Sequence, residues 1–274
     1  MSKRDRDRKL YTILLIICIV GFWLFENFYT PDTYSSKADD HSKSSVPSYF
    51  LPSSTTGVVI DHDHYTLSYN EDYEQAEWVA YKLKKSHLTS DNRQRPDFIE
   101  DPYVPTKSAD WRNYRGSGYD RGHLCPAGDR RFSELAYRET FYTSNISPQD
   151  NDFNAGIWNE LEMQVRIWTK KYGELFIATG GILEFGLPAI GEEDVAVPRW
   201  YYKIVSRGAK NDLKAIAFLI PHRPSEKSLE RYMVTIDRVE EMTGIDFMAE
   251  LPDRIEDNIE DQVEKSDWRL TAIH

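Results

Sequence analysis

Cysteine is almost absent from this chain of 274 residues, which contains only Cys18 and Cys125. Cys18 lies in an apolar stretch near the N-terminus and Cys125 lies far away in the middle of the sequence. Two such cysteines predict neither an internal disulfide nor a structural zinc site. We expect Cys125 to be a small buried residue in one sizeable hydrophobic core, for which the chain is long enough.

An excess of positive charge is also lacking. Lys and Arg number 34 against 45 Asp and Glu, so the formal net charge is −11. This balance argues against a protein that binds nucleic acid through overall charge alone. The acidic residues gather late in the sequence, however. Seven arginines in an earlier region can still form a local positive cleft: Arg95, Arg112, Arg115, Arg121, Arg130, Arg131 and Arg138.

Only one long hydrophobic run is present. Residues 10–25 carry no charge and follow a basic N-terminus. Residues 11–29 approach the 20 or so apolar residues that a membrane-spanning helix needs. Bulky residues at 22–25 occupy the place where a signal-cleavage site requires small ones. The sequence therefore favours an uncleaved anchor whose basic end is cytoplasmic, with the rest of the chain on the periplasmic or extracellular side. Secretion after cleavage of a signal peptide is the alternative.

Three regions follow from composition. Residues 1–29 form the basic N-terminus and anchor, residues 30–56 form a polar flexible linker, and residues 57–268 form the folded domain. Strand-like runs lie at 65–69, 75–85, 175–182, 197–205 and 214–220. Helices are expected from about Asn154, over 232–242 and beyond Asp253. The fold class is α+β, with a central, mainly antiparallel sheet flanked by helices.

Two polar patterns outside the main motif leave alternatives open. His62 and His64 alternate with aspartates, which is typical either of a metal site or of a polar turn before a strand, and we favour the turn. Lys82, Lys84 and Lys85 lie in the predicted strand at 75–85. These lysines either form its solvated face or contact nucleic acid.

The most informative stretch runs from 119 to 166. Ile157, Leu161 and Val165 repeat every four residues, which predicts a helix with an apolar stripe. Glu162 and Arg166 then share one face of this helix, and Asn154 lies at its start. Taken alone, these residues are typical of a helix cap followed by an ordinary ion pair.

Three sequence blocks in this stretch, taken together, carry a resemblance. They are DRGHLCPA at 120–127, YTSNISPQ at 142–149 and FNAGIWNELE at 153–162. In order and spacing the chain resembles the DNA/RNA non-specific endonucleases, the ββα-metal nucleases that include the endonuclease G type. The resemblance covers roughly residues 57–268 and implies a ββα-metal motif over about 103–168. His222 departs from the Asn expected after the Leu-Ile-Pro run, outside the expected site.

The resemblance implies a role for each matched residue. His123 looks like the general base that activates water, because a neutral imidazole can accept its proton at neutral pH. Asn154 looks like the single direct protein ligand of Mg²⁺, with Mn²⁺ as a possible substitute, and Glu162 like the carboxylate that orients its waters. Arg95, Arg121 and Arg166 match arginines that lie near the phosphate. Asn145 matches an asparagine that is expected to support the site by holding His123.

The resemblance therefore implies a magnesium-dependent endonuclease that cuts DNA and RNA and leaves 5′-phosphates. The alternative is a membrane-tethered nucleic-acid-binding module without turnover. The joint presence of His123, Arg121, Asn154 and Glu162 favours the enzyme, because a binding module has no chemical reason to keep all four.

Overall fold

The computed structural model describes residues 3–29, 46–209, 212–263 and 265–271, and it divides into two units at about residue 33. The N-terminal unit contains helix α1 (Lys3–Phe28). Its segment Arg6–Phe25 is long and apolar enough to cross a membrane, although a signal sequence has the same features. The predicted anchor segment is therefore helical. The helix alone does not distinguish an anchor from a signal sequence.

The second unit is built on a seven-stranded sheet in which every strand pair is antiparallel. This confirms the predicted α+β class with a large antiparallel sheet. The strands follow the order β1 (Val59–Asp61), β2 (Thr66–Asn70), β3 (Gln75–Lys84), β6 (Glu174–Gly181), β9 (Trp200–Arg207), β10 (Lys214–Pro221) and β11 (Met233–Val234). Two-stranded ribbons are formed by β4 (Asp120–His123) with β5 (Ile146–Gln149) and by β7 (Ala189–Ile190) with β8 (Val195–Ala196).

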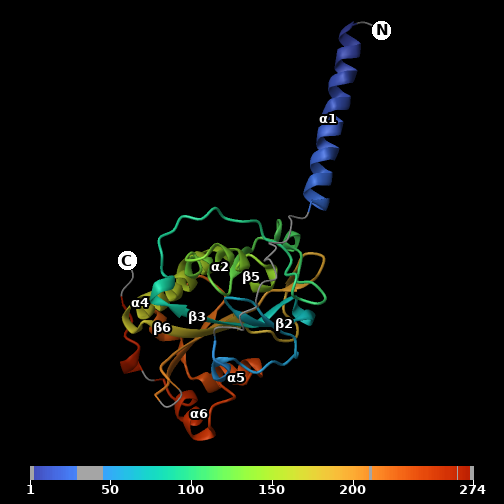
Figure 1. The fold of residues 1–274 in the computed structure, drawn as a ribbon. Helices are drawn as coiled ribbons and strands as arrows, with labels where there is room; N and C mark the ends of the chain where they lie inside the picture. Colours follow the sequence, from blue (N-terminus) through green and yellow to red (C-terminus); the bar gives the residue numbers. More distant parts are fainter. Residues whose placement is uncertain (1–2, 30–45, 210–211, 264, 272–274) are drawn as a thin grey trace. The chain divides into compact units, whose positions relative to one another are not determined.

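Each face of the sheet buries its own hydrophobic core, because alternate side chains of a strand point to opposite faces. On β3, Val79 and Tyr81 enter one core, while Trp78 and Ala80 enter the other. The first core receives α4 (Asn159–Tyr172), and the second receives α5 (Ile236–Thr243) and α6 (Asp253–Glu260). Figure 1 shows α2 (Glu134–Glu139) and β5 on the side of the sheet opposite α5 and α6.

The segment before residue 57 differs from the prediction of a flexible linker over 30–56. Residues 30–45 lie outside the described residues, but residues 46–56 pack against the sheet. Val46 and Phe50 are buried in the second core, and the Phe50 ring stacks on Phe176 with centroids 4.0 Å apart. Burial of a large aromatic ring contributes roughly 1.5–3 kcal/mol, which outweighs the polar composition around it. The packed part of the chain therefore includes Val46.

The helix predicted over 232–242 is shorter in the structure. The helix expected over 232–242 begins only at Ile236, because the side chain of Thr235 caps it by accepting a hydrogen bond from the N–H of Arg238. The residues just before it join the sheet as β11. Trp268 is buried against Trp168 in the first core, so the packed domain includes the region around Trp268.

Candidate active site

The β4–β5 ribbon holds His123 and Arg121 beside the helix that carries Asn154. The two strands pair antiparallel, with His123 opposite Ile146 and Asp120 opposite Gln149. A Cβ atom on Gly122 would come within 2.2 Å of the Gln149 side chain. The glycine of the Asp-Arg-Gly-His block therefore permits close packing between the strands, and this packing positions the residues on either side of it.

His123 lies in an aromatic setting that keeps its ring neutral. Its ring centroid is 5.6 Å from that of Phe98 and 5.0 Å from that of Phe141. Burial, together with the positive charge of Arg95, lowers the pKa of His123 to about 3. Its Nε2 atom is buried and has no hydrogen-bond partner among the described residues. The ring is therefore neutral at physiological pH, and its unpaired nitrogen can accept a hydrogen bond from a water molecule.

The helix that carries Asn154 begins earlier than predicted and contains an irregular turn. It starts as α3 (Asn151–Phe153), where the carboxylate of Asp150 caps the N–H of Phe153 at 3.0 Å. It continues through a kinked turn (Asn154–Trp158), where the backbone of Gly156 leaves the helical conformation, into α4. Asn154 is therefore not the cap but the first residue of this kinked turn. A glycine permits such a kink because it has no Cβ atom.

Asp120 fixes the orientation of the Asn154 amide. Asn154 Nδ2 donates to Asp120 Oδ2 at 3.0 Å, and Asn151 Nδ2 donates to the same oxygen at 3.0 Å. Because the amide nitrogen is held by the carboxylate, the carbonyl oxygen Oδ1 is turned away from it. Within the described part of the chain, Oδ1 accepts no hydrogen bond. It is therefore available as an oxygen ligand for a hard cation.

Glu162 and Arg166 lie on one face of α4, as predicted. Arg166 Nη2 is 3.2 Å from Glu162 Oε2, and Arg166 Nε donates to Asp129 Oδ1 at 2.6 Å. Burial raises the pKa of Glu162, while the positive charges of Arg166 and Lys203 oppose this shift. Lys203 is fully buried, with Nζ 4.6 Å from the ring centroid of Trp158. Two carboxylates and two cations thus form one charged cluster beneath the helix.

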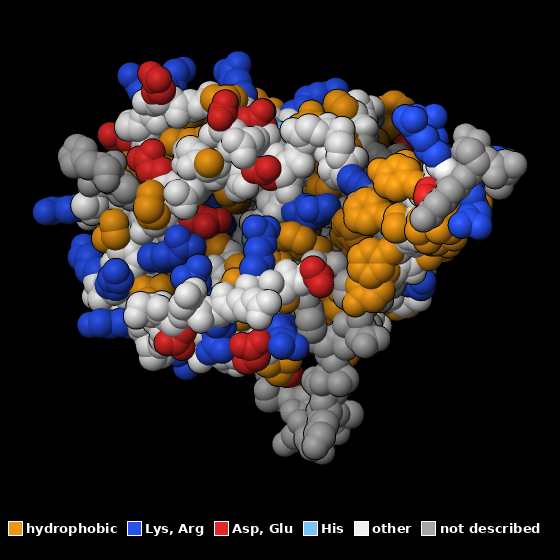
Figure 2. Space-filling view, turned by 90° about the horizontal axis from the view of Figure 1, so that it is seen from above, with side chains coloured by type: hydrophobic (Ala, Val, Ile, Leu, Met, Phe, Trp, Pro, Cys, Tyr) orange, Lys and Arg blue, Asp and Glu red, His pale blue; other side chains and the backbone are white. Residues whose placement is uncertain are grey.

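Two arginines flank the imidazole through a shared aromatic ring. The guanidinium carbons of Arg95 and Arg121 each lie 5.3 Å from the ring centroid of Phe98, which also contacts His123. Arg121 Nη2 also donates to the carbonyl oxygen of Trp111 at 3.1 Å. These guanidinium groups are suited to bind phosphate oxygens near His123. Figure 2 shows Lys and Arg side chains on a face that also carries acidic side chains.

Comparison with known proteins identifies the family. Residues 42–254 match the model of the DNA/RNA non-specific endonucleases. The chain belongs to the DNA/RNA non-specific endonuclease family. It is 34% identical over 207 residues to the mitochondrial nuclease EXOG of Danio rerio, covering 69% of this chain and 60% of that protein. It is 32% identical over 274 residues to a nuclease of Nostoc sp., covering 93% of this chain and 98% of that protein.

A solved structure shows the same fold. It is the crystal structure of the EndoG/EndoGI complex, which describes how EndoG is inhibited. The matched chain has a TM-score of 0.64 and 31% sequence identity to this chain. The match covers 72% of this chain and 87% of that one. The resemblance to endonuclease G inferred from the three sequence blocks is thereby confirmed, as is the α+β architecture around the ββα motif.

Asn145 contacts the loop after His123 rather than the ring of His123. Its Oδ1 accepts from the backbone N–H of Cys125 at 2.8 Å, and its Nδ2 donates to the carbonyl oxygens of Cys125 and Thr140. Asn145 is fully buried, so these bonds are shielded from water. Asn145 therefore braces the backbone that leaves β4. Cys125 is a small buried residue, as expected.

The predicted positive cleft is smaller than the sequence implies, because several of its arginines are engaged in structural contacts. Arg130 is fully buried and donates to the carbonyl oxygens of His64 and Lys82. Arg112 pairs with Asp110, and Arg138 pairs with Glu134.

His62, His64 and His222 have structural contacts. The segment holding His62 and His64 is a turn, as favoured, but the imidazole of His62 is buried and lies 2.9 Å from Asp101, while His64 lies 2.6 Å from Glu139. His222 lies outside the expected catalytic set. Its Nε2 nevertheless accepts from the N–H of Asp150 at 2.6 Å and thereby supports the start of the site helix.

Three residues with contacts in the site were not predicted. Asp120 lies within the matched Asp-Arg-Gly-His block and was detectable there as a candidate. Lys203 is the only charged residue of the strand run 200–206, and a lone charge in a buried strand is a recognisable signal. Asp129 has no such signal, because its role depends on Arg166 approaching it from α4.

Proposed function

We propose that this chain is a magnesium-dependent, sugar-non-specific endonuclease that hydrolyses phosphodiester bonds in DNA and RNA. One observation carries the proposal. The strand that ends in His123 begins with Asp120, and Asp120 holds the amide of Asn154. The candidate base and the candidate metal ligand are therefore linked through a four-residue strand and a single side-chain hydrogen bond.

The residues present fit a magnesium ion. Mg²⁺ is a hard cation that needs only one or two protein oxygens and keeps several waters. Asn154 Oδ1 supplies a neutral oxygen ligand. Glu162 is a carboxylate on the same helix that can hold coordinated water, while Arg166 and Lys203 balance its charge. Mn²⁺ prefers the same oxygen and carboxylate donors, so we expect it to substitute.

Each site residue has its own role in the proposed hydrolysis. His123 accepts a proton from a water molecule as the water oxygen bonds to phosphorus. The bond from phosphorus to the 3′ oxygen breaks, and that oxygen takes up a proton, which leaves a 5′-phosphate and a 3′-hydroxyl. Arg95, Arg121 and Arg166 hold phosphate oxygens in the orientation for this displacement. When bound, the ion stabilises negative charge on the phosphate and on the departing oxygen.

The helix α1 leads us to propose a location as well. We infer that α1 is an uncleaved membrane anchor and that the nuclease domain lies on the periplasmic or extracellular side. The basic residues before the apolar segment support this orientation, because short basic flanks stay in the cytoplasm. Carbonate extraction of membranes tests the anchor: the full-length chain should stay in the membrane pellet. Recovery of an N-terminally shortened chain in the soluble fraction would instead indicate a cleaved signal.

A plasmid-nicking assay tests the function. Supercoiled DNA and a matched RNA should both be cut with Mg²⁺ and left intact with EDTA. His123→Ala should lower the rate of the chemical step by about 10²–10⁴-fold, while Asn154→Ala should also raise the Mg²⁺ concentration needed for half-maximal rate. Exposed Arg199, which pairs with Glu184, offers a matched control as Arg199→Ala. A wild-type chain that binds DNA but never cuts it would instead support the membrane-tethered binding module.

A further inference from the structure

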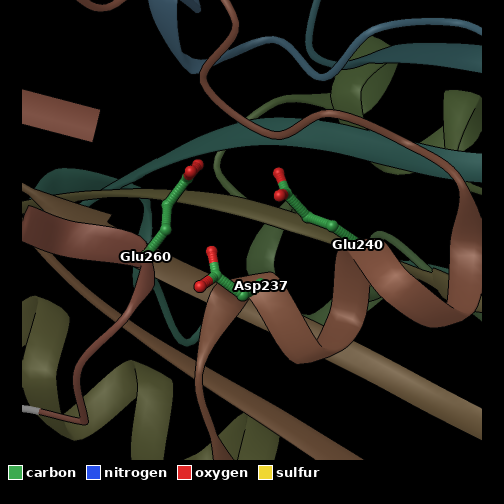
Figure 3. A group of neighbouring side chains, drawn as sticks. All are labelled: Asp237, Glu240 and Glu260. Atoms are coloured by element: carbon green, nitrogen blue, oxygen red, sulfur yellow. The ribbon is translucent and has the colours of Figure 1, made fainter. Parts of the chain in front are cut away.

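A second cluster of charged residues lies on the opposite side of the sheet from the candidate active site. Asp237 and Glu240 project from α5, and Glu260 is the last residue of α6. One carboxylate oxygen from each residue lies within 4.8 Å of one from each of the others. Figure 3 shows the three side chains arranged around a common space between the two helices.

The negative charge of this cluster is not balanced by any basic side chain that the structure describes. Arg238 follows Asp237 in sequence, but its Nη1 turns to Glu241 at 2.6 Å. The last turn of α6 contains no basic residue. Glu260 thus adds a negative charge at a helix C-terminus, where the helix dipole already disfavours one. Glu240 has one donor, the backbone N–H of Phe247 at 2.7 Å.

Glu260 gives a second and independent indication of a ligand. Its exposed fraction is only 6%, and its Oε1 atom is buried without a hydrogen-bond partner in the described part of the chain. Burying a carboxylate is costly unless the charge is paired or coordinates a metal.

We propose that Asp237, Glu240 and Glu260 bind a divalent cation of the calcium type, which fastens α6 to α5. Oxygen ligands alone favour a hard cation. The three carboxylate oxygens lie within 4.8 Å of one another, so one ion can contact all three. Three carboxylate ligands are more typical of Ca²⁺ than of Mg²⁺, which is usually held by one or two. Asp237 is exposed, so water can complete the six to eight ligands that Ca²⁺ takes.

The site is independent of the proposed catalytic ion. Ile236 and Val239 of α5 enter the second hydrophobic core, whereas Ile157 and Leu161 of the site helix enter the first. The sheet separates the two cores. With three ligating carboxylates, one of them exposed, we expect a dissociation constant of about 10⁻⁴–10⁻³ M, the range of extracellular calcium modules. The bound ion should therefore stabilise the domain without taking part in hydrolysis.

Calcium-dependent thermal unfolding of the full-length chain in detergent micelles tests the proposal. After EDTA treatment and dialysis, 5 mM CaCl₂ should raise the melting temperature of the wild type by about 2–6 °C. Asn154→Ala, which removes the candidate catalytic ligand, should show the same rise. Glu260→Gln and Asp237→Asn should lose it. Glu241→Gln, a change on the exposed face of α5, is the matched control and should keep the rise.

Two further readouts separate this site from the nuclease activity. Equilibrium dialysis with ⁴⁵Ca²⁺ should show one bound ion fewer in Glu260→Gln and in Asp237→Asn than in Glu241→Gln. Nicking by both variants in Mg²⁺ should equal that of the wild type at a temperature where all are folded. The proposal is overturned if the wild type shows no calcium-dependent rise, or if Asp237→Asn, whose exposed side chain is not needed for packing, keeps both the rise and the bound ion.

Discussion

Asn154 Nδ2 donates a hydrogen bond to Asp120 Oδ2 at 3.0 Å, and this contact joins the kinked turn of the site helix to the start of β4. An asparagine amide has a donor end and an acceptor end. The carboxylate accepts from the donor end, so the acceptor end faces the other way. Asp120 thereby fixes which atom of Asn154 is available to the proposed cation.

Replacing Asp120 should weaken metal binding. In Asp120→Ala the Asn154 amide is free to rotate, so we expect the Mg²⁺ concentration for half-maximal nicking to rise by about 10–100-fold. The maximal rate at saturating Mg²⁺ should fall less. Asn151→Ala is the matched control, because it removes the other donor to Asp120 but leaves Asn154 held. Equal magnesium dependence in Asp120→Ala and wild type would show that Asp120 does not support metal binding.

The low pKa of His123 predicts an unusual pH profile. A folded-state value of about 3 means that the imidazole stays neutral well below the ordinary value of 6.5. The acidic limb of log(kcat/KM) should therefore show no break near pH 6.5. In NMR titrations, the ring resonance that disappears in His123→Ala should not shift between pH 5 and 8. A resonance with a midpoint near 6.5 would contradict the buried, neutral imidazole.

The same shift has a consequence for stability. Above pH 6.5 the ring is neutral in both the folded and the unfolded chain, so its contribution to folding is fully kept. As the pH falls from 6.5 towards 3, only the unfolded chain takes up the proton, and stability is lost. The free energy of unfolding of wild type minus that of His123→Gln should therefore decrease over this window. It should be constant above pH 7.

Gly122 should be intolerant of any side chain. A Cβ atom would meet the Gln149 side chain at 2.2 Å, and overpacking of this kind costs about 1–3 kcal/mol. Gly122→Ala should lower the free energy of urea unfolding by this amount and reduce nicking, because β4 carries His123. The double variant Gly122→Ala with Gln149→Ala should regain part of both losses. A single variant as stable as the wild type would show that β4 and β5 are not packed as described.

Asp129 should be more important for stability than a surface acid. Its side chain is 1% exposed and accepts from Arg166 at 2.6 Å, so Asp129→Asn leaves the positive charges of Arg166 and Lys203 poorly balanced. We expect Asp129→Asn to lower the free energy of unfolding by about 3 kcal/mol, measured by urea unfolding. Glu184→Gln, which breaks the exposed pair with Arg199, should cost less than about 1 kcal/mol. Similar losses in the two variants would contradict the buried charge cluster.

Strand positions and the shared helix face of Glu162 and Arg166 were predicted well from the sequence. The strands at 75–85, 175–182 and 214–220 are present within about one residue at each end, because alternation and β-branched residues define them locally. Glu162 and Arg166 share a helix face, since four residues make about one turn. Helix starts were less predictable. Asp150 rather than Asn154 caps the site helix, and the kink at Gly156 interrupts the helix at a place that no periodicity reveals.

Long-range contacts explain the other differences. Arg130 was predicted to line a positive cleft, but it is buried, and its guanidinium donates to carbonyl oxygens of the β1–β2 turn and of β3. Residues 46–56 have a linker composition, yet Phe50 meets a matching ring at Phe176. Glu260 of α6 is 20 residues or more from Asp237 and Glu240 of α5 in the sequence. The three carboxylates come together only because the two helices pack against each other.

The central claim is that Asn154 holds one divalent ion near His123, and anomalous diffraction tests it most directly. Crystals of the His123→Ala variant with a short DNA duplex and Mn²⁺ should show an anomalous peak about 2.2 Å from Asn154 Oδ1, with the scissile phosphate between the ion and the position of the missing imidazole. An ion bound away from Asn154, with Oδ1 turned towards other protein atoms, would contradict the account.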